Sequence, residues 1–368
     1  MPDQIGIPAT FMRGGTSKGL FFRWEALDGL DRDRFLCAAL GSPDDYGRQL
    51  DGMGGGISSL SKAMMVRRSD REGIDVDYLF AQVEIGQAEV DYAANCGNLT
   101  SAVACFAVDQ GFVQLADGPA VVAMWNENTA KRIDAHLVVR DGRAAVSGTE
   151  EIAGVSGQGS PIRLAFRNPG GAWTGALLPT GNPMDRAVLG EHTVEYSFVD
   201  AANPCVFVRG QDIGCSADTL PADIAARPEV MEALDQIRRQ AAARAGREAA
   251  PGAPKIALVS PPRDFPTLAG GTVAGAESDL LIRMVSMGQA HLAIPLTGAL
   301  CTAVAARIAG TVVNEAVRIG APDHPVRIGT ASGIVPANAE MKPGPEALSA
   351  SVYRTARALM EGTVYAPI

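Results

Sequence analysis

Residues 95–105 read NCGNLTSAVAC, and residues 296–306 read LTGALCTAVAA. When Gly97 is aligned with Gly298, both stretches follow one pattern of Gly, any residue, Leu, any residue, Ser or Thr, then Ala-Val-Ala, at an offset of 298 − 97 = 201 residues. Both predict a helix that is apolar nearly all round, and such a helix is normally buried on every side. The repeat therefore favours two similar domains, each with strands around one central helix. A chance repeat of small residues is the alternative.

The composition limits the classes of protein to which the chain can belong. Its 368 residues have room for two domains, each with a core. The net charge of −9 argues against binding to nucleic acid, because no basic stripe offsets the acidic surface. The six cysteines form no CxxC pair, so neither a disulfide framework nor a zinc site is expected. Because we find no signal-peptide pattern and no membrane-spanning run, we expect a cytoplasmic protein with reduced thiols.

The remaining sequence predicts many short strands and few further helices. Apolar or alternating runs bounded by Gly, Pro, Asn or Asp are expected to be strands, at 9–12, 19–23, 78–85, 120–125, 135–139, 163–166, 205–208 and 256–259. Apolar residues at helical spacing predict helices at 32–39 and 230–240. A frayed helix end and surface loop are expected to follow over 241–254.

Cys96 stands at the head of the first repeat, where the second repeat has Thr297. The first turn of a helix leaves backbone N–H groups free, which favours a carboxylate or phosphate ligand. A thiol at this positive end ionises more readily than a free thiol. A structural role in the core is the alternative for Cys96. That role is expected for three other cysteines, Cys105, Cys205 and Cys301.

The stretch DGMGGGISSLSK at 51–62 combines consecutive glycines with serines and ends in Lys62. Its backbone can approach a ligand closely, because glycine has no side chain to intervene. Lys62 precedes the apolar run 63–66. Either its ammonium reaches water at the edge of the strand, or the amine is desolvated in a pocket and becomes a usable base.

The stretch FMRGGTSKGLFF at 11–22 places Arg13, Ser17 and Lys18 around a glycine turn between two strands. It is not a phosphate-binding P-loop, which needs GxxxxGK followed by Ser or Thr and a helix. An ordinary hairpin with solvated charges and an anion clamp remain as alternatives. Of the four histidines, only His291 lies near a candidate site, shortly before the second repeat. No Ser-His-Asp or metal-ligand cluster is evident.

Several long and uncommon motifs resemble the PrpF family. They are MRGGTSKG at 12–19, DGMGGGISSLSK at 51–62, DYLFAQV at 77–83, NCGN at 95–98, LPTGN at 178–182 and ANPCVFV at 202–208. The similarity extends to RTARALMEGTVY at 354–365, so it covers nearly the whole chain. The family includes 2-methylaconitate cis–trans isomerase, 3-methylitaconate Δ-isomerase and 4-oxalomesaconate tautomerase.

The resemblance implies the diaminopimelate-epimerase-like fold. This is an α/β (α+β) architecture of two pseudo-symmetric domains, each with strands around a central helix, and an active site in the interdomain cleft. We expect an N-terminal domain over 1–185 with its helix from about 98, and a C-terminal domain over 186–350 with its helix from about 299. The segment 351–368 is expected to return to the N-terminal domain.

The resemblance also implies the site residues. The family pairs a lysine with a cysteine as acid–base groups, which fall on Lys62 and Cys96, and Ser17 is expected near the substrate. Such groups can move an allylic proton in a small unsaturated di- or tricarboxylate without a cofactor or a metal. Substrate contacts are expected from Arg13, Ser17, Lys18, Gly97, Asn98, Asn203, His291, Thr297, Gly298 and Ala299.

The second half departs from the family pattern and leaves the substrate open. Leu292 follows His291 where some members have a basic residue, and 329–333 read GTASG where GHPSG or GHPAG is expected. The candidates are 2-methylaconitate, aconitate, 3-methylitaconate and 4-oxalomesaconate. An amino-acid racemase or epimerase is one alternative, disfavoured because Thr297 replaces the second thiol of diaminopimelate epimerase. A non-catalytic tricarboxylate-binding accessory protein is the other. A homodimer is expected, without nucleic-acid or membrane partners.

Overall fold

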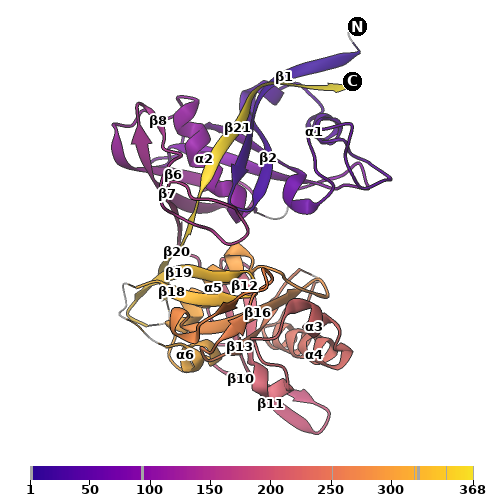
Figure 1. Cartoon of the computed structure of the whole chain (residues 1–368), viewed down its shortest axis with the longest axis vertical. Coiled ribbons are helices and arrows are strands. Elements are labelled where there is room, and N and C mark those ends of the chain that lie inside the picture. The colour runs from indigo at the N-terminus through magenta and orange to yellow at the C-terminus, as the bar shows by residue number, and fades with distance from the viewer. Residues whose placement is uncertain are drawn as a thin grey trace. The chain divides into compact units, whose positions relative to one another are not determined.

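The structure, a computed structural model, describes residues 3–92, 95–250, 252–318, 320, 324–344 and 346–367 (Figure 1). The chain forms two compact units: unit 1 comprises residues 1–165 and 353–368, and unit 2 comprises residues 166–352. The division after residue 165 differs from the expected boundary after residue 185. The reason is that Trp173 packs against the core of unit 2, and the backbone N–H of Gly171 donates to the carbonyl of Asp200 in that unit.

Unit 1 is a mixed sheet with a helix, α2 (Gly97–Asp109), packed against it. Its strands are β1 (Gln4–Gly14), β2 (Ser17–Arg23), β3 (Lys62–Arg68), β4 (Val76–Val83), β5 (Val90–Asp91), β6 (Gly118–Asn126), β7 (Lys131–Arg140), β8 (Arg143–Ala144), the start of β9 (Ile162–Arg167) and β21 (Ala356–Pro367). The short helices are η1 (Trp24–Leu27), α1 (Arg32–Leu40) and η2 (Ser58–Leu60).

Unit 2 has the corresponding central helix α5 (Leu296–Ala306). Its strands are β10 (Asp185–Leu189), β11 (His192–Ala201), β12 (Asn203–Arg209), β13 (Lys255–Ser260), β14 (Phe265–Pro266), β15 (Thr272–Val273), β16 (Leu280–Ser286), β17 (Gln289–Ala290), β18 (Val326–Thr330), β19 (Gly333–Lys342) and most of β20 (Glu346–Arg354). Its other helices are η3 (Gly210–Ile213), α3 (Pro221–Ala225), α4 (Pro228–Arg244), η4 (Gly275–Glu277) and α6 (Val312–Ala316).

The two units repeat one order of strand pairs. In unit 1, β1–β2, β3–β4, β4–β5 and β6–β7 are antiparallel, whereas β2–β3 and β4–β6 are parallel. In unit 2, β11–β12, β13–β16, β16–β17 and β18–β19 are antiparallel, whereas β12–β13 and β16–β18 are parallel. The duplication inferred from the two helix sequences therefore extends to the sheets, and the expected pseudo-symmetric fold is confirmed.

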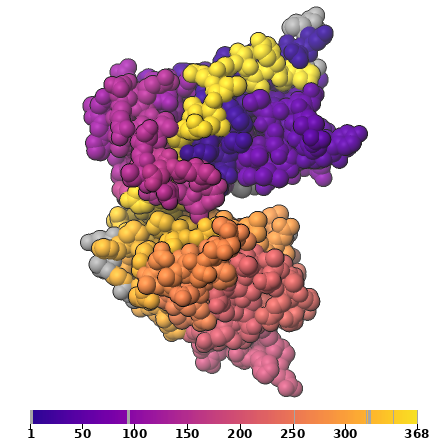
Figure 2. Space-filling model, in the orientation of Figure 1, coloured from indigo at the N-terminus to yellow at the C-terminus, as the bar shows by residue number. Residues whose placement is uncertain are grey.

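The C-terminal strand completes the sheet of unit 1. β21 runs antiparallel to β1 from the Gln4–Pro367 pair to the Gly14–Ala356 pair. In unit 2 the same place beside β11 is taken by β10, which immediately precedes β11 in the chain. The first strand of the repeat is thus supplied from the C-terminus in unit 1. Figure 2 shows this segment in yellow against the indigo N-terminal residues.

The central helices are buried as their composition predicts. Every residue of α2 from Leu99 to Val108 is buried, and so is every residue of α5 from Gly298 to Ala306. All six cysteines are free, and only Cys96 among them is not fully buried. The expected core positions of Cys105, Cys205 and Cys301 are therefore confirmed. In the described part of the chain, no helix has both the length and the apolar character to span a bilayer.

The sequence missed several strands and misjudged one helix end. The strands that were not predicted include β19, β20 and β21, and also β16, although β16 is buried along its whole length. The frayed end expected over 241–254 is wrong in its first part, because α4 continues to Arg244. Ala241 and Ala242 are fully buried in the core of unit 2, which stabilises this last turn. Residue 251 of that predicted loop lies outside the described residues.

The pairing of β21 with β1 gives a first prediction. Ala366 is 0% exposed and belongs to the core of unit 1, whereas the neighbouring Tyr365 is 64% exposed on the other face of the strand. Ala366→Asp buries an unpaired charge, so we expect a loss of about 3–5 kcal/mol in the free energy of unfolding. The matched control Tyr365→Asp should cost less than about 1 kcal/mol. Urea unfolding of both variants measures the difference, and equal losses would contradict the observed strand orientation.

Candidate active site

Cys96 and Ser17 meet at the start of the central helix of unit 1. Cys96 is the N-cap residue of α2, and its thiol makes no capping hydrogen bond. The thiol instead donates to Ser17 Oγ, with 3.8 Å between Sγ and Oγ. Cys96 is half-buried, and Ser17 is 3% exposed at the start of β2. Of the sequence-predicted residues, these two are therefore brought into direct contact.

The glycines of the first motif let the hairpin turn pack onto this helix start. A Cβ atom on Gly14 would lie 2.6 Å from the backbone oxygen of Asn98. Gly15 has φ +52°, and a Cβ atom there would lie 2.4 Å from Asn98 Oδ1. A side chain at position 14 would therefore displace the helix backbone, and one at position 15 would displace the Asn98 side chain and be strained by the positive φ. The pair of glycines thus brings Ser17 to the head of α2.

Asn98 is fixed by side chains from two segments that are distant in sequence. Its Nδ2 donates to Thr16 Oγ1 at 3.0 Å, and its Oδ1 accepts a hydrogen bond from Arg354 Nε at 3.0 Å. Burial lowers the pKa of Arg354 to about 10. The Asn98 side chain is thus committed within unit 1, while the backbone N–H groups of Gly97 and Asn98 belong to the first turn of α2. Groups in that position are available to an anion.

Lys62 begins β3 with its ammonium group away from bulk water. Nζ donates a hydrogen bond to Gln82 Oε1 and lies 4.9 Å from the centroid of the Phe80 ring. The residue is only 8% exposed. Within the described ranges, no carboxylate forms a salt bridge with it. Of the two alternatives for Lys62, the structure shows the buried one, and the role of Lys62 as a base stays a prediction.

Gln82 is a site residue that the sequence reasoning missed. It lies opposite Lys62 across the β3–β4 pair. Its Nε2 donates to the carbonyl of Ser61 at 2.9 Å and to that of Ser58 at 3.2 Å, which turns Oε1 towards the lysine. The available signal was a glutamine within the otherwise apolar end of the strand motif DYLFAQV.

The glycine-rich loop at 51–56 packs against its own neighbours. A Cβ atom on Gly52 would lie 2.1 Å from the backbone nitrogen of Gly41, and one on Gly54 would lie 2.3 Å from Gln49 Oε1. The buried Gln49 side chain donates to Ser61 Oγ at 2.7 Å. Close packing against neighbouring segments therefore explains why Gly52 and Gly54 are glycines. The same contacts fix the backbone just before Lys62.

The two cations of the expected anion clamp have different surroundings. Arg13 and Lys18 lie opposite each other on the β1–β2 hairpin. The Arg13 guanidinium donates to the carbonyls of Gly15 and Thr355 at 3.0 and 2.9 Å, and to Thr355 Oγ1 at 3.0 Å. Lys18 Nζ lies 5.9 Å from the centroid of the Phe11 ring. Arg13 therefore holds the C-terminal segment, and a role of either residue in substrate binding stays a prediction.

The helix start in unit 2 has no thiol. Thr297, Gly298 and Ala299 lie in the first turn of α5, where Thr297 is half-buried and the other two are buried. Cys301 lies one turn further into the helix and donates to the carbonyl of Val199 at 3.3 Å. Burial raises the pKa of Cys301. Cys301 is thus a core residue and does not replace the missing second thiol.

His291 and Asn203 are the other candidate residues of unit 2. His291 Nε2 lies 2.6 Å from Ser286 Oγ. Burial, and next the charge of Lys255, lower the pKa of His291 below its ordinary value of 6.5. Asn203 begins β12, and its Oδ1 is buried with no hydrogen-bond partner among the described residues. A buried oxygen of this kind is suited to a ligand that donates a hydrogen bond.

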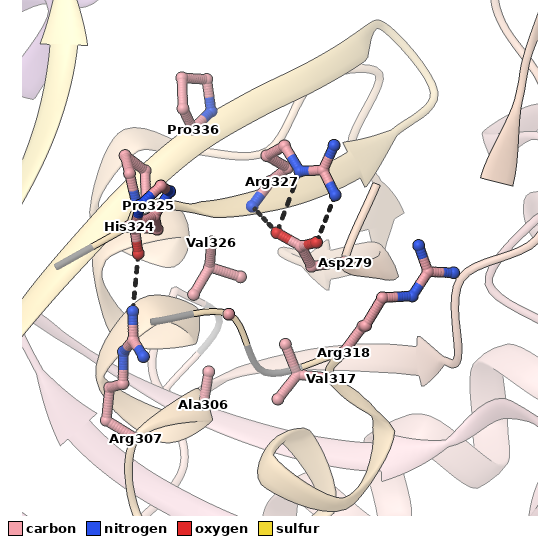
Figure 3. Close-up of a pocket in the computed structure, with 11 residues that line it drawn as sticks. Asp279, Ala306, Arg307, Val317, Arg318, His324, Pro325, Val326, Arg327 and Pro336 are labelled. Atoms are coloured by element: carbon pink, nitrogen blue, oxygen red, sulfur yellow. Dashed lines mark hydrogen bonds and ion pairs between the residues drawn. The ribbon is translucent and has the colours of Figure 1, made fainter. Parts of the chain in front are cut away.

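A cavity of about 400 Å³ lies elsewhere in unit 2 (Figure 3). Its carboxylate, Asp279, is paired with Arg327 at 2.7 Å, and Arg307 donates to the carbonyl of His324 at 2.7 Å. The cavity adjoins the C-terminal end of α5, the opposite end from Thr297. For this reason we do not assign it to the candidate active site. In the described ranges, no three His, Cys, Asp or Glu side chains are grouped to bind a metal.

The lowered pKa of His291 gives a second prediction. The pKa of His291 is lower in the folded state than its ordinary value of 6.5, which applies to the unfolded chain. As the pH falls, the unfolded state therefore binds the proton first. The stability associated with neutral His291 is therefore complete above about pH 6.5 and is lost as the pH falls towards the folded-state pKa. We expect His291→Gln to flatten this decline in thermal unfolding between pH 8 and pH 5. His192→Gln, on the exposed end of β11, is the control and should retain the wild-type decline.

Three comparisons place the chain among known proteins. The family model described as PrpF protein matches residues 4–367. The chain is 38% identical over 376 residues to 3-methylitaconate isomerase of Eubacterium barkeri, covering 99% of this chain and 98% of the relative. It is also 38% identical over 395 residues to 2-methyl-aconitate isomerase of Shewanella oneidensis, covering 100% and 98%. A crystal structure of methylitaconate Δ-isomerase matches with a TM-score of 0.92 at 37% identity, covering 100% of this chain and 97% of that one. The chain belongs to the PrpF family.

Proposed function

We propose that this protein is a double-bond isomerase that acts on a small unsaturated di- or tricarboxylate, with Lys62 as the base. The observation that carries the proposal is the buried Lys62 side chain, which donates a hydrogen bond to Gln82 and forms no salt bridge with a carboxylate among the described residues. Cys96 acts as a second acid or as a positioning donor. No cofactor is needed for this chemistry.

The parallel strands β2 and β3 bring these groups to one end of the sheet. Ser17 begins β2 and Lys62 begins β3, and the two strands pair in parallel from Leu20 and Ala63 onward. A Cβ atom on Gly19 would lie 2.5 Å from the backbone oxygen of Lys62 and 3.0 Å from Leu99 Cδ1 of α2. Glycine at this position therefore lets β3 approach the helix that Cys96 caps.

The proposed reaction is a transfer of one proton between two carbons of the substrate. The neutral Lys62 amine removes the allylic proton, and the electron pair of the broken C–H bond delocalises over the double bond to a carboxylate. A proton then adds to a different carbon of this dienolate, from the Lys62 ammonium or from the Cys96 thiol, and the double bond is restored in its new position. If the thiol is the donor, the proton held by Lys62 returns to the Cys96 thiolate, directly or through solvent, before the next turnover. Backbone N–H groups of Gly97 and Asn98 stabilise the negative charge that develops on the carboxylate.

The choice among unsaturated acids depends on residues outside this pair. The relatives at 38% identity are named for methylitaconate and methylaconitate, so both acids are candidates. Aconitate and 4-oxalomesaconate complete the set to be tested. We include in the proposal that the helix starts of both units contact one substrate, and that the protein is a homodimer, which size-exclusion chromatography with light scattering can test.

Lys62→Ala should abolish most of the activity. Removal of a general base typically lowers the rate by about 10²–10⁴-fold, and we expect a loss of this size in kcat for the substrate that wild type turns over. The measurement is the rate of deuterium incorporation at the allylic carbon in deuterated water, followed by NMR. Lys342→Ala is the control, because Lys342 forms an exposed pair with Glu346 at 2.5 Å. Near-normal turnover by Lys62→Ala would remove Lys62 from the role of base.

Cys96→Ser separates the two roles offered for the thiol. If Cys96 delivers a proton, the variant should still wash deuterium into the allylic position but form product at least about 10²-fold more slowly. If deuterium exchange and product formation fall by the same factor, Cys96 does not act only in the second proton transfer. In the same four-acid screen, exchange at the Cα of an amino acid would favour a racemase, and thermal stabilisation without any exchange would favour an accessory protein.

A further inference from the structure

The duplication allows the two units to be aligned residue by residue. β2 ends at Arg23 and is followed at once by η1, and β12 ends at Arg209 and is followed at once by η3. Both strands have seven residues, so their first residues, Ser17 and Asn203, are also equivalent. Ser17 and Asn203, both candidate substrate-binding residues, thus occupy the same position in the two units.

The same register assigns a counterpart to the base of unit 1. Arg23 pairs with Val66 on β3, and its equivalent Arg209 pairs with Val259 on β13. Four residues before these two valines stand Lys62 and Lys255, each the first residue of its strand. Both halves therefore place a lysine at the same position of the fold.

The neighbours of the two lysines differ. Gln82 lies opposite Lys62 and accepts a hydrogen bond from its ammonium. The antiparallel register of β13 and β16, extended by one residue, places Ser286 opposite Lys255. Ser286 is engaged instead with His291, at 2.6 Å between Oγ and Nε2. Among the described residues of unit 2, no side chain accepts a hydrogen bond from Lys255 as Gln82 does from Lys62.

Lys255 is an ammonium group without a strong partner in the described part of the chain. It is half-buried, and no salt bridge joins it to a carboxylate there. Among the described residues its hydrogen-bond partner is the carbonyl of Gly252, at a long distance of 3.5 Å from Nζ. The charge of Lys255 lies near His291. Burial is the larger cause of the lowered pKa of His291, and the charge of Lys255 is the smaller one. A charge in this state is available to a ligand anion.

We propose that Lys255 is a substrate-binding residue, whose ammonium holds a carboxylate group of the unsaturated acid. This inference rests on the proposed function, because it names a further residue of the same site. A substrate with two or three carboxylates is bound best by cations, and Lys62 is already assigned to the proton transfer. The Arg13 guanidinium is already committed to Thr355. Lys255 is a cation that the repeat itself places in the second unit, at the position equivalent to the base.

The test compares three substitutions of Lys255 with the acid that wild type turns over among the four screened. Loss of a charge-assisted hydrogen bond in Lys255→Met should raise KM by about 10- to 100-fold, while kcat stays within about threefold of wild type. Lys255→Arg keeps the charge and should retain a KM within about fivefold of wild type. Lys255→Gln removes the charge but keeps a polar side chain, and it should behave as Lys255→Met. Lys342→Met is the surface control.

An unchanged KM in Lys255→Met and Lys255→Gln would overturn the assignment. A large loss of kcat with unchanged KM would also overturn it, since that result describes a proton-transfer group. If Lys255→Met unfolds, as thermal unfolding would detect, Lys255→Gln decides. A wild-type protein that exchanges no proton in any of the four acids would overturn the proposed function itself. Normal wild-type turnover with unaltered Lys255 variants would count against Lys255 alone.

Discussion

A helix without a polar face has to be covered on all sides, and this requirement organises both halves of the protein. In α2 every residue from Leu99 to Val108 is buried, and in α5 every residue from Gly298 to Ala306 is buried. Strands must surround such a helix, so each unit is a mixed sheet wrapped around it. The backbone N–H groups of the first helical turn have no partner within the helix. An apolar helix enclosed by a sheet therefore leaves its N-terminus as the natural place for an anion.

The closing of the sheet in unit 1 and the construction of the helix start depend on the same residues. β21 pairs with β1 along the whole length of β1. Where it begins, Thr355 accepts hydrogen bonds from Arg13, and Arg354 donates to Asn98. The C-terminal segment thus fixes both the hairpin turn that carries Ser17 and the first turn of α2. In unit 2 the equivalent strand, β10, is the segment that immediately precedes β11 in the sequence. The long-range connection through the C-terminal segment is therefore specific to unit 1, which contains Cys96.

Local patterns in the sequence were sufficient to predict the four longest helices and many strands, but not the features that depend on strand pairing. The two Ala-Val-Ala segments could be predicted as buried because their composition allows no other face. The strand register could not be predicted from local patterns. The equivalence of Lys62 with Lys255 follows from that register alone. Gln82 was missed for the same reason, since only the β3–β4 pair places it opposite the lysine. The first unit boundary was misplaced because the packing of Trp173 on the core of unit 2 is a tertiary contact.

The two halves have kept one architecture and changed its chemistry. The equivalent positions are Ser17 and Asn203, Gln82 and Ser286, and, by sequence, Cys96 and Thr297. Inversion at a tetrahedral carbon requires groups on both of its faces, and two matched halves suit that task. A dienolate is planar and delocalised, so the proton that leaves one carbon can return to another from the same side. One base is then enough, and the second half no longer needs to match the first. The proposed role of Lys255 in binding a carboxylate uses this freedom. In the described part of the second half, the Lys255 ammonium has only a long contact to the Gly252 carbonyl, whereas the unpaired Asn203 oxygen suits a ligand group that donates a hydrogen bond.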